Sequence, residues 1–409
     1  MGSDFEIDVA AERRLTEFFG QIGRVLNHEN RRASFAMYAL GLLGDGERKS
    51  VEPIAARACG DPALCEAYQA RLLHFIADSQ WDDHGVRRAA TKYALSAMVE
   101  REPIETWIVD DTGFLKQGKH SVGVQRQYTG SAGKIANCQI GVSLSVATKT
   151  EHIPIDFELY LPKSWANDPV QRAKGKIPDE VEFETKPELA LDMIRWAVED
   201  GVPLGVLLAD SGYGDSSAFR EGVRELGLDY AVGIHGPTNV WRLDKRGRRS
   251  GAAISARDLA LAIGPKGFRR TTWREGTREP LRSRFAMQRV VSAHDDGVDP
   301  AQREEVWLLM EWPDAEAEPT HYFLTTLPRD MTRKRLVRIV KERYRTERLY
   351  EDLKGELGLD HFEGRSFAGW HHHISVALCC YSFVVAERVR RFPPAARWSP
   401  QADAFSLAA

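Results

Sequence analysis

The spacing of apolar residues changes near residue 105, and this change constrains the fold most. Before it, Leu15, Phe18 and Ile22 recur at helical intervals, GDG at 44–46 interrupts the pattern, and ALCEAYQARLLHFIADSQW resumes it. After it, apolar residues alternate in WIVDD, CQIGVSLSVATKT and IPIDFELYLP, as they do in strands. The sequence therefore predicts a helical N-terminal domain over residues 1–102, followed by a sheet.

The next segments alternate between helical and strand patterns. KPELALDMIRWAVEDG and SSAFREGVRELG are helical, whereas VPLGVLLAD and LDYAVGI are typical of strands. Several strands followed by a strand, helix, strand unit indicate an α/β (α+β) core with a mixed sheet. We expect residues 103–235 to form the first part of this core.

The alternation stops after Ile234 for about ninety residues. VWLLMEW and HYFLTTL are strand-like and flank the acidic connection PDAEAEP, so residues 236–328 are predicted to be a β-rich insertion. LVRIVKERYRTERLYEDLK then forms a single predicted helix. Residues 329–392 are expected to complete the core with C-terminal helices, and residues 393–409 to form a tail.

Charge is segregated along the chain. The formal net charge is −3, but residues 242–289 hold 14 basic and four acidic residues, among them Arg246, Arg248 and Arg249. Residues 333–354 hold nine basic and four acidic residues. Such stretches can bind a polyanion, whereas the plainer interpretation is a solvated charged face.

Cysteine spacing and hydropathy bear on the compartment. None of the five cysteines lies in a C-x-x-C motif, which favours a reducing cytoplasm and argues against structural zinc. No apolar stretch approaches the roughly 20 residues of a membrane span, and the N-terminus is too polar for a targeting segment. We therefore expect a cytoplasmic protein without a membrane partner.

Acidic residues follow apolar runs in three separate regions. Asp110 and Asp111 follow WIV, Asp210 follows VLLA, and Glu347 lies in the helical RYRTERLYEDLK. Carboxylates at the carboxyl ends of strands can converge, and Mg²⁺ prefers carboxylate oxygens. Two such ions can activate water and stabilise a leaving oxygen, which indicates phosphoryl transfer on DNA or RNA. The plainer interpretation makes Asp210 a turn residue beside a helix cap.

Arg343, Glu347 and Lys354 are four and seven residues apart, so a helix would place them on one face. This pattern suits an acid that holds metal between two cations that grip phosphate. It equally suits a surface ladder of ion pairs. The consecutive His371, His372 and His373 point to different helix faces, which favours packing over a metal pair.

Six motifs stand in order along the chain: VDDTGFLKQG, SVGVQRQYTGSAGKIANCQIGVSL, ELYLPKSW, EFETKPELA, ADSGYG and ELGLDHFEGRSFAGWHHH. With them, the chain resembles bacterial insertion-sequence transposases of the DDE superfamily over nearly its whole length. The resemblance implies an RNase H-like core with an inserted β domain before the final acidic helix. The N-terminal helical domain could read DNA ends by inserting a helix into the major groove, but helical packing alone suits a structural role equally well.

The resemblance also implies roles for particular residues. Arg343, Glu347 and Lys354 match the last three positions of a Tyr, Arg, Glu, Lys signature, whose tyrosine position holds Val340. A D-x-[ST] pattern at the first acid selects Asp110, with Asp111 as the alternative or a supporting residue. Further expected contacts to DNA are Lys116, Lys119, Arg126, Arg246, Arg248 and Arg249. Trp307 or Trp312 could stack on a flipped base, although core packing is the plainer role.

The implied activity is cut-and-paste transposition. Asp110, Asp210 and Glu347 would hold two Mg²⁺ or Mn²⁺ ions, cleave DNA at the element's terminal inverted repeats and join the freed ends to target DNA. A homodimer is expected in the DNA complex, because paired ends are cut together, and the bound protein would be associated with the nucleoid. The alternatives are a metal-dependent nuclease without strand transfer and a domesticated DNA-binding regulator.

Overall fold

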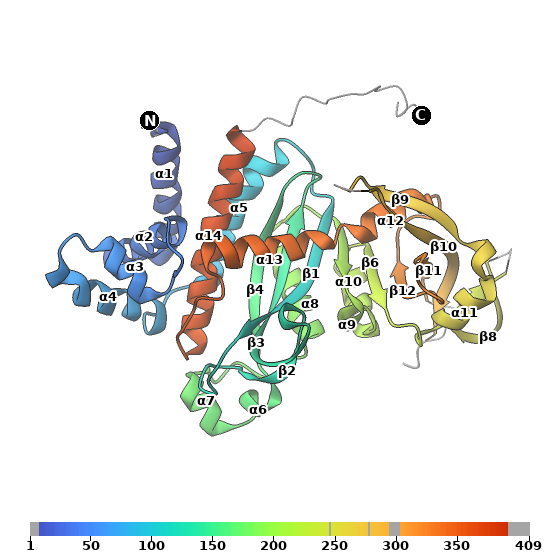
Figure 1. Cartoon of the computed structure of the whole chain (residues 1–409), viewed down its shortest axis with the longest axis horizontal. Coiled ribbons are helices and arrows are strands. Elements are labelled where there is room, and N and C mark those ends of the chain that lie inside the picture. The colour runs from blue at the N-terminus through green and yellow to red at the C-terminus, as the bar shows by residue number, and fades with distance from the viewer. Residues whose placement is uncertain (1–7, 245–246, 277–278, 294–302, 392–409) are drawn as a thin grey trace.

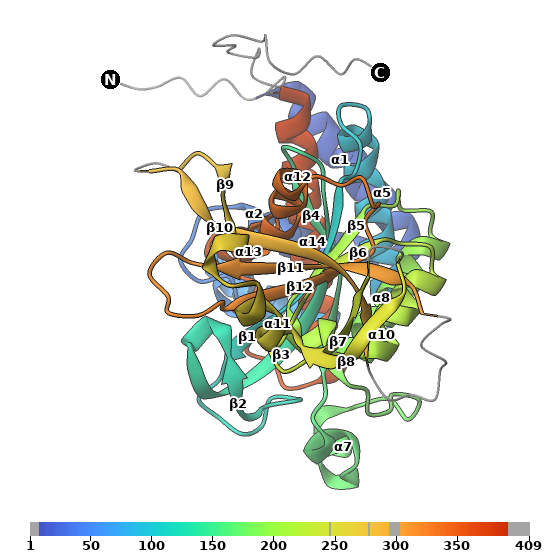
Figure 2. The ribbon, with the colours of Figure 1, turned by 90° about the vertical axis from the view of Figure 1, so that its right-hand side faces the viewer.

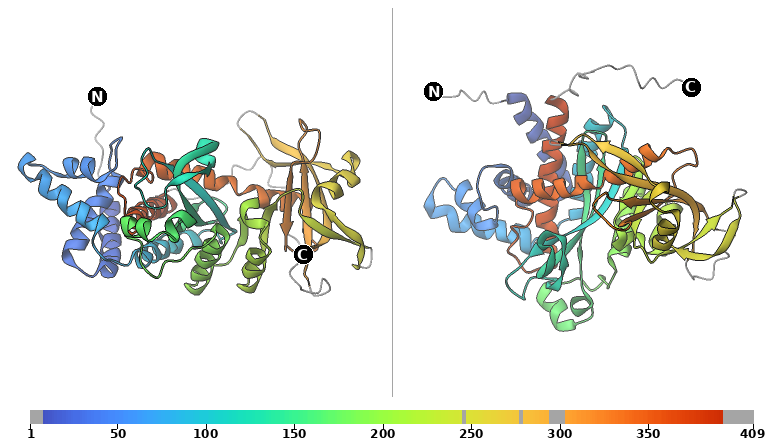
Figure 3. Two further views of the ribbon diagram at one scale, coloured as in Figure 1. Left: turned by 90° about the horizontal axis from the view of Figure 1, so that it is seen from below. Right: turned by 45° about the vertical axis from the view of Figure 1, so that its right-hand side comes forward.

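The computed structural model describes residues 8–244, 247–276, 279–293 and 303–391. N-terminal helices, a sheet core and a β-rich insertion follow one another along the longest axis (Figure 1), and the view from below shows the same succession (Figure 3). The mixed α/β architecture confirms the predicted fold class. Arg246 and the predicted tail at 393–409 lie outside the described residues.

The N-terminal region is helical, as its periodicity predicts. The first helix begins where the Asp8 side chain accepts a hydrogen bond from the Ala11 amide, and it buries Phe18 and Ile22. The last helix of this region, α5, packs against β4 (His152–Tyr160) and α14 (Phe367–Arg391), so it covers the sheet. The helices are α1 (Val9–Leu26), α2 (Glu29–Leu43), α3 (Val51–Ala58), the 3-10 turn η1 (Pro62–Leu64), α4 (Cys65–Ala77) and α5 (Asp83–Val99).

The core sheet has the strand order β4, β3, β1, β5, β6. β1 pairs antiparallel with β3 along its whole length and parallel with β5, which in turn lies parallel to β6. Three antiparallel strands followed by two parallel ones make this sheet RNase H-like. The elements are β1 (Thr106–Leu115), β2 (Gln125–Thr129), the turn η2 (Gly130–Ala132), β3 (Lys134–Ala147), α6 (Lys163–Ala166), α7 (Pro169–Gly175), α8 (Lys186–Glu199), β5 (Val206–Ala209), α9 (Ser211–Gly214), α10 (Ser217–Glu225) and β6 (Tyr230–Ile234).

The β-rich insertion continues the core sheet. Its strand β12 pairs antiparallel with β6, where Tyr322 faces Ile234, so in the described part of the chain one sheet of twelve strands runs through both parts. Figure 2 looks onto the insertion end on. Its elements are β7 (Asn239–Leu243), β8 (Arg249–Ser255), α11 (Ala256–Ile263), η3 (Pro265–Gly267), β9 (Arg269–Arg274), β10 (Leu281–Ser292), β11 (Glu305–Trp312) and β12 (His321–Thr325).

The chain after the insertion forms two helices where the sequence predicted one: α12 (Arg333–Lys341) and α13 (Tyr344–Leu357). The prediction of a continuous helix was wrong, because the amides of Arg345 and Thr346 bond three residues back, to Glu342 and Arg343, and tighten the turn there. The apolar periodicity continues across the break, so it gave no sign of it. Glu347 consequently lies in the first turn of α13.

The long helix α14 is buried on most sides. His371, His372 and His373 are buried, as the packing interpretation predicts; His372, for example, stacks on Trp81 with ring centroids 3.9 Å apart. Burial lowers the pKa of both His372 and His373 to about 4, so both are neutral. Among the described residues, no helix is long and apolar enough to cross a membrane.

Candidate active site

Acids from three regions of the chain line one pocket. Asp110 comes from β1, Asp210 caps α9 directly after β5, and Glu347 belongs to α13. With Arg343 and Lys354 they line a pocket of about 740 Å³. The pocket is possible because β5 pairs with β1 only from Thr106 to Ile108, so the edge of β1 is open beyond that point.

The prediction that Asp110 lies at the carboxyl end of its strand was wrong. Asp110 does not end its strand: β1 continues to Leu115, because antiparallel pairing with β3 supports it over its whole length. Asp210 does follow the last residue of β5, and its carboxylate accepts a hydrogen bond from the Gly212 amide at 2.8 Å. The turn interpretation of Asp210 is thus correct in geometry and is compatible with a place in the pocket.

The carboxylate of Asp110 is buried beside a cation. Arg343 Nη1 lies 2.6 Å from Asp110 Oδ2. Burial raises the pKa of Asp110 to about 7, Arg343 opposes this rise, and the negative charge of Asp210 adds to it. Burial acts to lower the pKa of Arg343, but Asp110, Asp210 and Glu347 outweigh it and raise that pKa. The guanidinium of Arg343 therefore interacts electrostatically with all three acids of the pocket.

Asp110, Asp210 and Glu347 line the same pocket, but their carboxylates do not converge on a single point. Within the described part of the chain, the one group of three or more potential ligands whose atoms all lie within 4.8 Å of one another is His84, Asp156 and Glu158. Asp110, Asp210 and Glu347 are therefore more widely spaced than the ligands of a single closed site. In this arrangement the guanidinium of Arg343 provides the positive charge next to Asp110.

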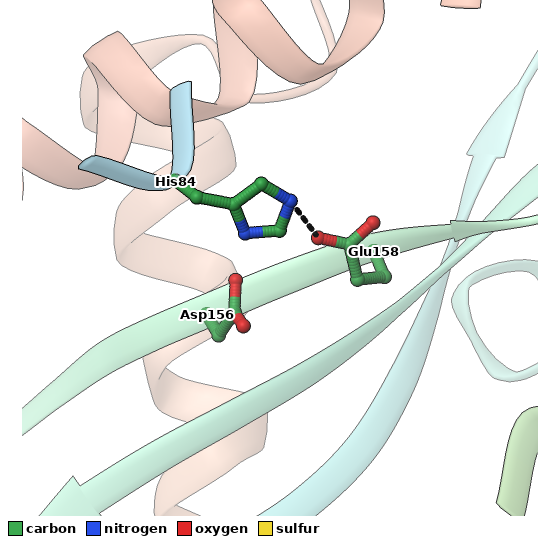
Figure 4. A group of neighbouring side chains, drawn as sticks. All are labelled: His84, Asp156 and Glu158. Atoms are coloured by element: carbon green, nitrogen blue, oxygen red, sulfur yellow. Dashed lines mark ion pairs between the residues drawn. The ribbon is translucent and has the colours of Figure 1, made fainter. Parts of the chain in front are cut away.

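Figure 4 shows the side chains of His84, Asp156 and Glu158 next to one another. The guanidinium of Arg87 pairs with both carboxylates of this cluster. Arg87 Nε lies 2.8 Å from Asp156 Oδ1, and Arg87 Nη2 lies 2.8 Å from Glu158 Oε1. Burial works to raise the pKa of Glu158, but His371 and Arg87 outweigh it and lower this pKa to about 2. The guanidinium takes the place that a metal ion would need, so this cluster is a structural ion network.

Asp110 and Asp111 have different partners, as neighbours on a strand should. Asp111 Oδ2 lies 3.0 Å from Lys186 Nζ of α8 and accepts a hydrogen bond of 3.2 Å from the Tyr213 hydroxyl. Asp110 instead faces α13 through Arg343. Both acids line the pocket, but each pairs with a different cationic side chain, Asp110 with Arg343 and Asp111 with Lys186.

Two of the lysines expected to bind phosphate are occupied within the protein. Lys354 Nζ donates to Thr112 Oγ1 and to Gly113 O, both at 2.9 Å, and so ties α13 to β1. Lys116 Nζ donates to the Phe362 carbonyl oxygen at 2.6 Å, and burial lowers its pKa. Lys119 and Arg126 are exposed near the β2–β3 hairpin. Of these residues, Lys119 and Arg126 are the more available to DNA.

Much of the positive charge of the insertion is paired internally. Arg248 binds Asp244, with an Nη2 to Oδ2 distance of 3.1 Å, and Arg249 lies over the Trp241 ring. Other arginines of the insertion form ion pairs with acids of the insertion: Arg257 with Glu318, Arg270 and Arg284 with Asp314, and Arg289 with Glu305. Arg246 lies outside the described residues.

The two tryptophans considered for base stacking have partners in the fold. Trp312 is buried, packs edge-on against Phe268 and donates from its indole nitrogen to Glu316 O. The Trp307 indole donates to Pro328 O at 3.0 Å, and Arg289 lies over its ring. Both contacts agree with the packing role that the sequence favoured.

Several residues that line the pocket were not predicted from the sequence. Tyr350 lies one helical turn after Glu347, and its hydroxyl is 2.6 Å from Ser143 Oγ. Lys186 and Tyr213 hold Asp111, and Tyr128 stands at the rim. Tyr350 could have been found by extending the face of Arg343 and Glu347 by three residues. Lys186 carried no signal, because only the tertiary fold brings α8 beside β1.

The sheet order and the acid-lined pocket together define an RNase H-like, nuclease-type core. The family described as DDE superfamily endonuclease matches residues 17–280, well over half of the chain, and the chain belongs to this family. The match includes Asp110 and Asp210 and ends before Glu347.

A curated relative is similar to part of the chain. It is described as a probable transposase for insertion sequence element IS701, from Microchaete diplosiphon, and it is 30% identical over 202 residues. These residues are 49% of this chain and 48% of the relative, so the chain spans about half the length of the curated protein it matches.

Proposed function

We propose that this chain is a transposase that cleaves DNA at the ends of a mobile element and joins the ends to target DNA. The observation that carries the proposal is the pocket lined by Asp110, Asp210 and Glu347, three acids from separate regions of the chain. Membership of the DDE superfamily endonucleases and similarity to a probable transposase support DNA cleavage as the reaction.

The pocket suits divalent cations such as Mg²⁺ or Mn²⁺, and we propose two. Its donors are carboxylates, which hard cations prefer. Burial is the main cause of the raised pKa of Asp110, and the negative charge of Asp210 adds to it. A bound cation would relieve the repulsion between these two carboxylates. Asp110, Asp210 and Glu347 would hold the metal. When bound, it supplies activation of water and neutralisation of phosphate charge.

Asp110 is the better candidate for the first acid. Its carboxylate faces α13, the helix that carries Glu347, and its charge interacts with that of Asp210. Asp111 is held by Lys186 and Tyr213 on the side of α8. We infer that Asp111 supports the pocket by fixing α8 against β1.

The remaining polar residues hold and orient the substrate. Arg343 presents a guanidinium at the pocket and can bind a DNA phosphate there, because planar guanidinium groups match phosphate oxygens. Lys354 holds α13 against β1, which keeps Glu347 in line with Asp110. Lys119, Arg126 and the basic surface of the insertion are proposed to bind flanking DNA, and a homodimer would bring two ends together.

Replacing one acid tests the proposal. Asp210→Asn keeps the shape of the side chain and its acceptor oxygen but removes the charge, so we expect DNA cleavage in Mg²⁺ to fall at least roughly a hundredfold. DNA binding should change by no more than about twofold, since the carboxylate carries no positive charge to lose. Asp192→Asn, at a partly exposed residue of α8 that pairs with Arg195, is the matched control. Full cleavage by Asp210→Asn would refute the assignment.

The products distinguish a transposase from its alternatives. Incubation of cleaved ends with a supercoiled plasmid should give joined molecules if the chain catalyses strand transfer. Cleavage without joining would indicate a metal-dependent nuclease, and binding without cleavage a DNA-binding regulator.

A further inference from the structure

Tyr128 stands out among the aromatic side chains of the structure. Among the described residues three aromatic side chains are exposed: Tyr128 at 66%, Trp196 at 49% and Tyr344 at 40%. Arg88 lies 4.8 Å from the Trp196 ring and Arg274 4.0 Å from the Tyr344 ring. Within that described set, the Tyr128 ring has no such cover, and it lies at the rim of the acidic pocket.

A second apolar side chain extends this surface. Tyr128 of β2 faces Ile135 of β3 across the antiparallel ladder, and Ile135 is 58% exposed. Side chains directly opposite each other on two strands lie in contact range. The Tyr128 ring and the Ile135 side chain therefore form one small exposed apolar surface beside the acids, which we call the step. Exposing this surface to water does not stabilise the fold.

The hairpin that carries this step is fixed to the pocket. Lys354 Nζ lies 3.2 Å from Ser131 Oγ in the hairpin turn, while also holding Thr112 and Gly113 of β1. Thr129 packs so closely on Gly113 that a Cβ at Gly113 would meet Thr129 Oγ1 at 1.9 Å. Tyr128 thus has a set position relative to Asp110, three residues before Gly113.

The charge around the step suits a nucleic acid. Arg126, Lys134 and Lys119 are exposed on or beside the hairpin, and within the described ranges none of them forms an ion pair with a carboxylate. Cations that flank an aromatic ring are the recurring arrangement where proteins bind the backbone and stack the bases of single strands. A base within a duplex has both faces covered, so the step suits an unpaired base.

We propose that Tyr128, backed by Ile135, stacks on an unpaired nucleobase next to the phosphate that enters the acidic pocket. This rests on the proposed function, because it is DNA cleavage that brings a phosphate to Asp110. Tyr128 acts as a positioning residue: it fixes the strand so that the phosphodiester bond lies at the acids. The ligand class is a single-stranded or locally opened DNA end.

Two DNA probes with equal charge test the stacking. One is a duplex with a short single-stranded thymidine overhang, and the other carries abasic residues in the same overhang, so that phosphates are kept and bases removed. Without divalent metal, the wild-type chain should bind the thymidine probe roughly tenfold more tightly, the effect expected for about one stacked base. Fluorescence anisotropy gives both affinities.

The variants separate stacking from a loss of fold. Tyr128→Ala should bind both probes equally, whereas Tyr128→Trp should keep or increase the preference for bases. Trp196→Ala removes an exposed aromatic outside the pocket and should leave the preference unchanged. A thymidine probe substituted with 5-iodouracil should crosslink to the peptide that contains Tyr128. Equal binding of both probes by the wild type, or an unchanged preference in Tyr128→Ala, would overturn the proposal.

The two proposals can fail separately. If the wild type cleaves DNA and Asp210→Asn does not, but the overhang preference is absent, only the stacking proposal fails. If the preference depends on Tyr128 and no cleavage occurs, the acidic pocket is not a nuclease site.

Discussion

At the scale of single residues, the pairing of Arg343 with Asp110 is the most informative contact in the pocket. The two groups are 2.6 Å apart, and Asp110 is only 9% exposed. A buried carboxylate without a cation would be costly, so Arg343 stabilises the pocket before anything binds. A metal ion that binds Asp110 must compete with this guanidinium.

Arg343→Gln should therefore change metal binding and cleavage in opposite directions. Loss of Arg343 also raises the pKa of Asp110, which is about 7 in the wild type, so the two proteins are compared at a pH well above 7, where Asp110 is ionised in both. There we expect Mn²⁺ to bind the variant roughly tenfold more tightly, a gain of about 1.4 kcal/mol, because no guanidinium competes with it. Cleavage should fall because the phosphate loses a cation. Titration of Mn²⁺ followed by electron paramagnetic resonance gives the affinity.

Arg348→Gln is the matched control, since Arg348 lies in the first turns of α13, the helix that Arg343 directly precedes, is largely exposed and pairs with Asp352. It should leave both quantities unchanged. Mn²⁺ binding by Arg343→Gln that is equal to or weaker than that of the wild type would show that the guanidinium does not compete with the metal.

At the scale of elements, an ion network joins α5 to β4. Arg87 of α5 is buried and contacts Asp156 and Glu158 of β4 as well as Asp83 of its own helix. His371 of α14 adds a contact to Glu158 at 3.0 Å. These pairs connect three elements that lie far apart in the sequence.

Removing Arg87 should loosen this junction. Arg87→Met removes the buried guanidinium from the partly buried Asp156 and Glu158 and leaves Glu158 paired only with histidines, and breaking a buried pair from one side costs about 3–5 kcal/mol. Arg88→Met removes the neighbouring arginine, whose pair with Asp200 is exposed, and should cost about 1 kcal/mol or less. Urea unfolding followed by circular dichroism compares the two variants. Equal losses would contradict the structural role assigned to Arg87.

Element types could be predicted from the sequence better than element junctions. The change of apolar period near residue 105 indicated the helical region and the sheet, and β1, α8 and β6 lie where their patterns placed them. The break between α12 and α13, before Tyr344, could not be predicted, because the apolar residues keep their helical spacing across the tightened turn. Three pocket acids were found because each follows an apolar run or lies in a helical charge pattern.

Contacts between elements were beyond the sequence. Alternation along β1 predicts only that Asp110 and Asp111 point to opposite faces of the sheet. Which of the two faces α13 depends on the side of the sheet on which that helix packs. Lys186 reaches Asp111 from α8, 75 residues along the chain. The pairing of Lys354 with β1 likewise depends on how α13 lies over the sheet.

At the scale of the whole molecule, positive charge is available at the N-terminal end as well as near the acids. A pocket of about 440 Å³ between α2 and α4 is lined by Arg31 and Arg71. Their Nε atoms donate to Ser79 and Ser34, and within the described ranges neither forms an ion pair with an acid. Such a pocket can accept a DNA phosphate at a distance from the acidic pocket.

A double variant, Arg31→Ala with Arg71→Ala, should weaken DNA binding without abolishing cleavage of DNA that is already bound. Each phosphate contact contributes about 0.9 to the slope of log affinity against log salt concentration, so the slope should decrease by about 1 to 2. Anisotropy titrations over a salt series measure it. Arg13→Ala, an exposed residue of α1 paired with Glu17, is the control and should leave the slope unchanged. An unchanged slope in the double variant would remove the N-terminal pocket from the DNA-binding surface and leave the hairpin and the insertion to bind the duplex.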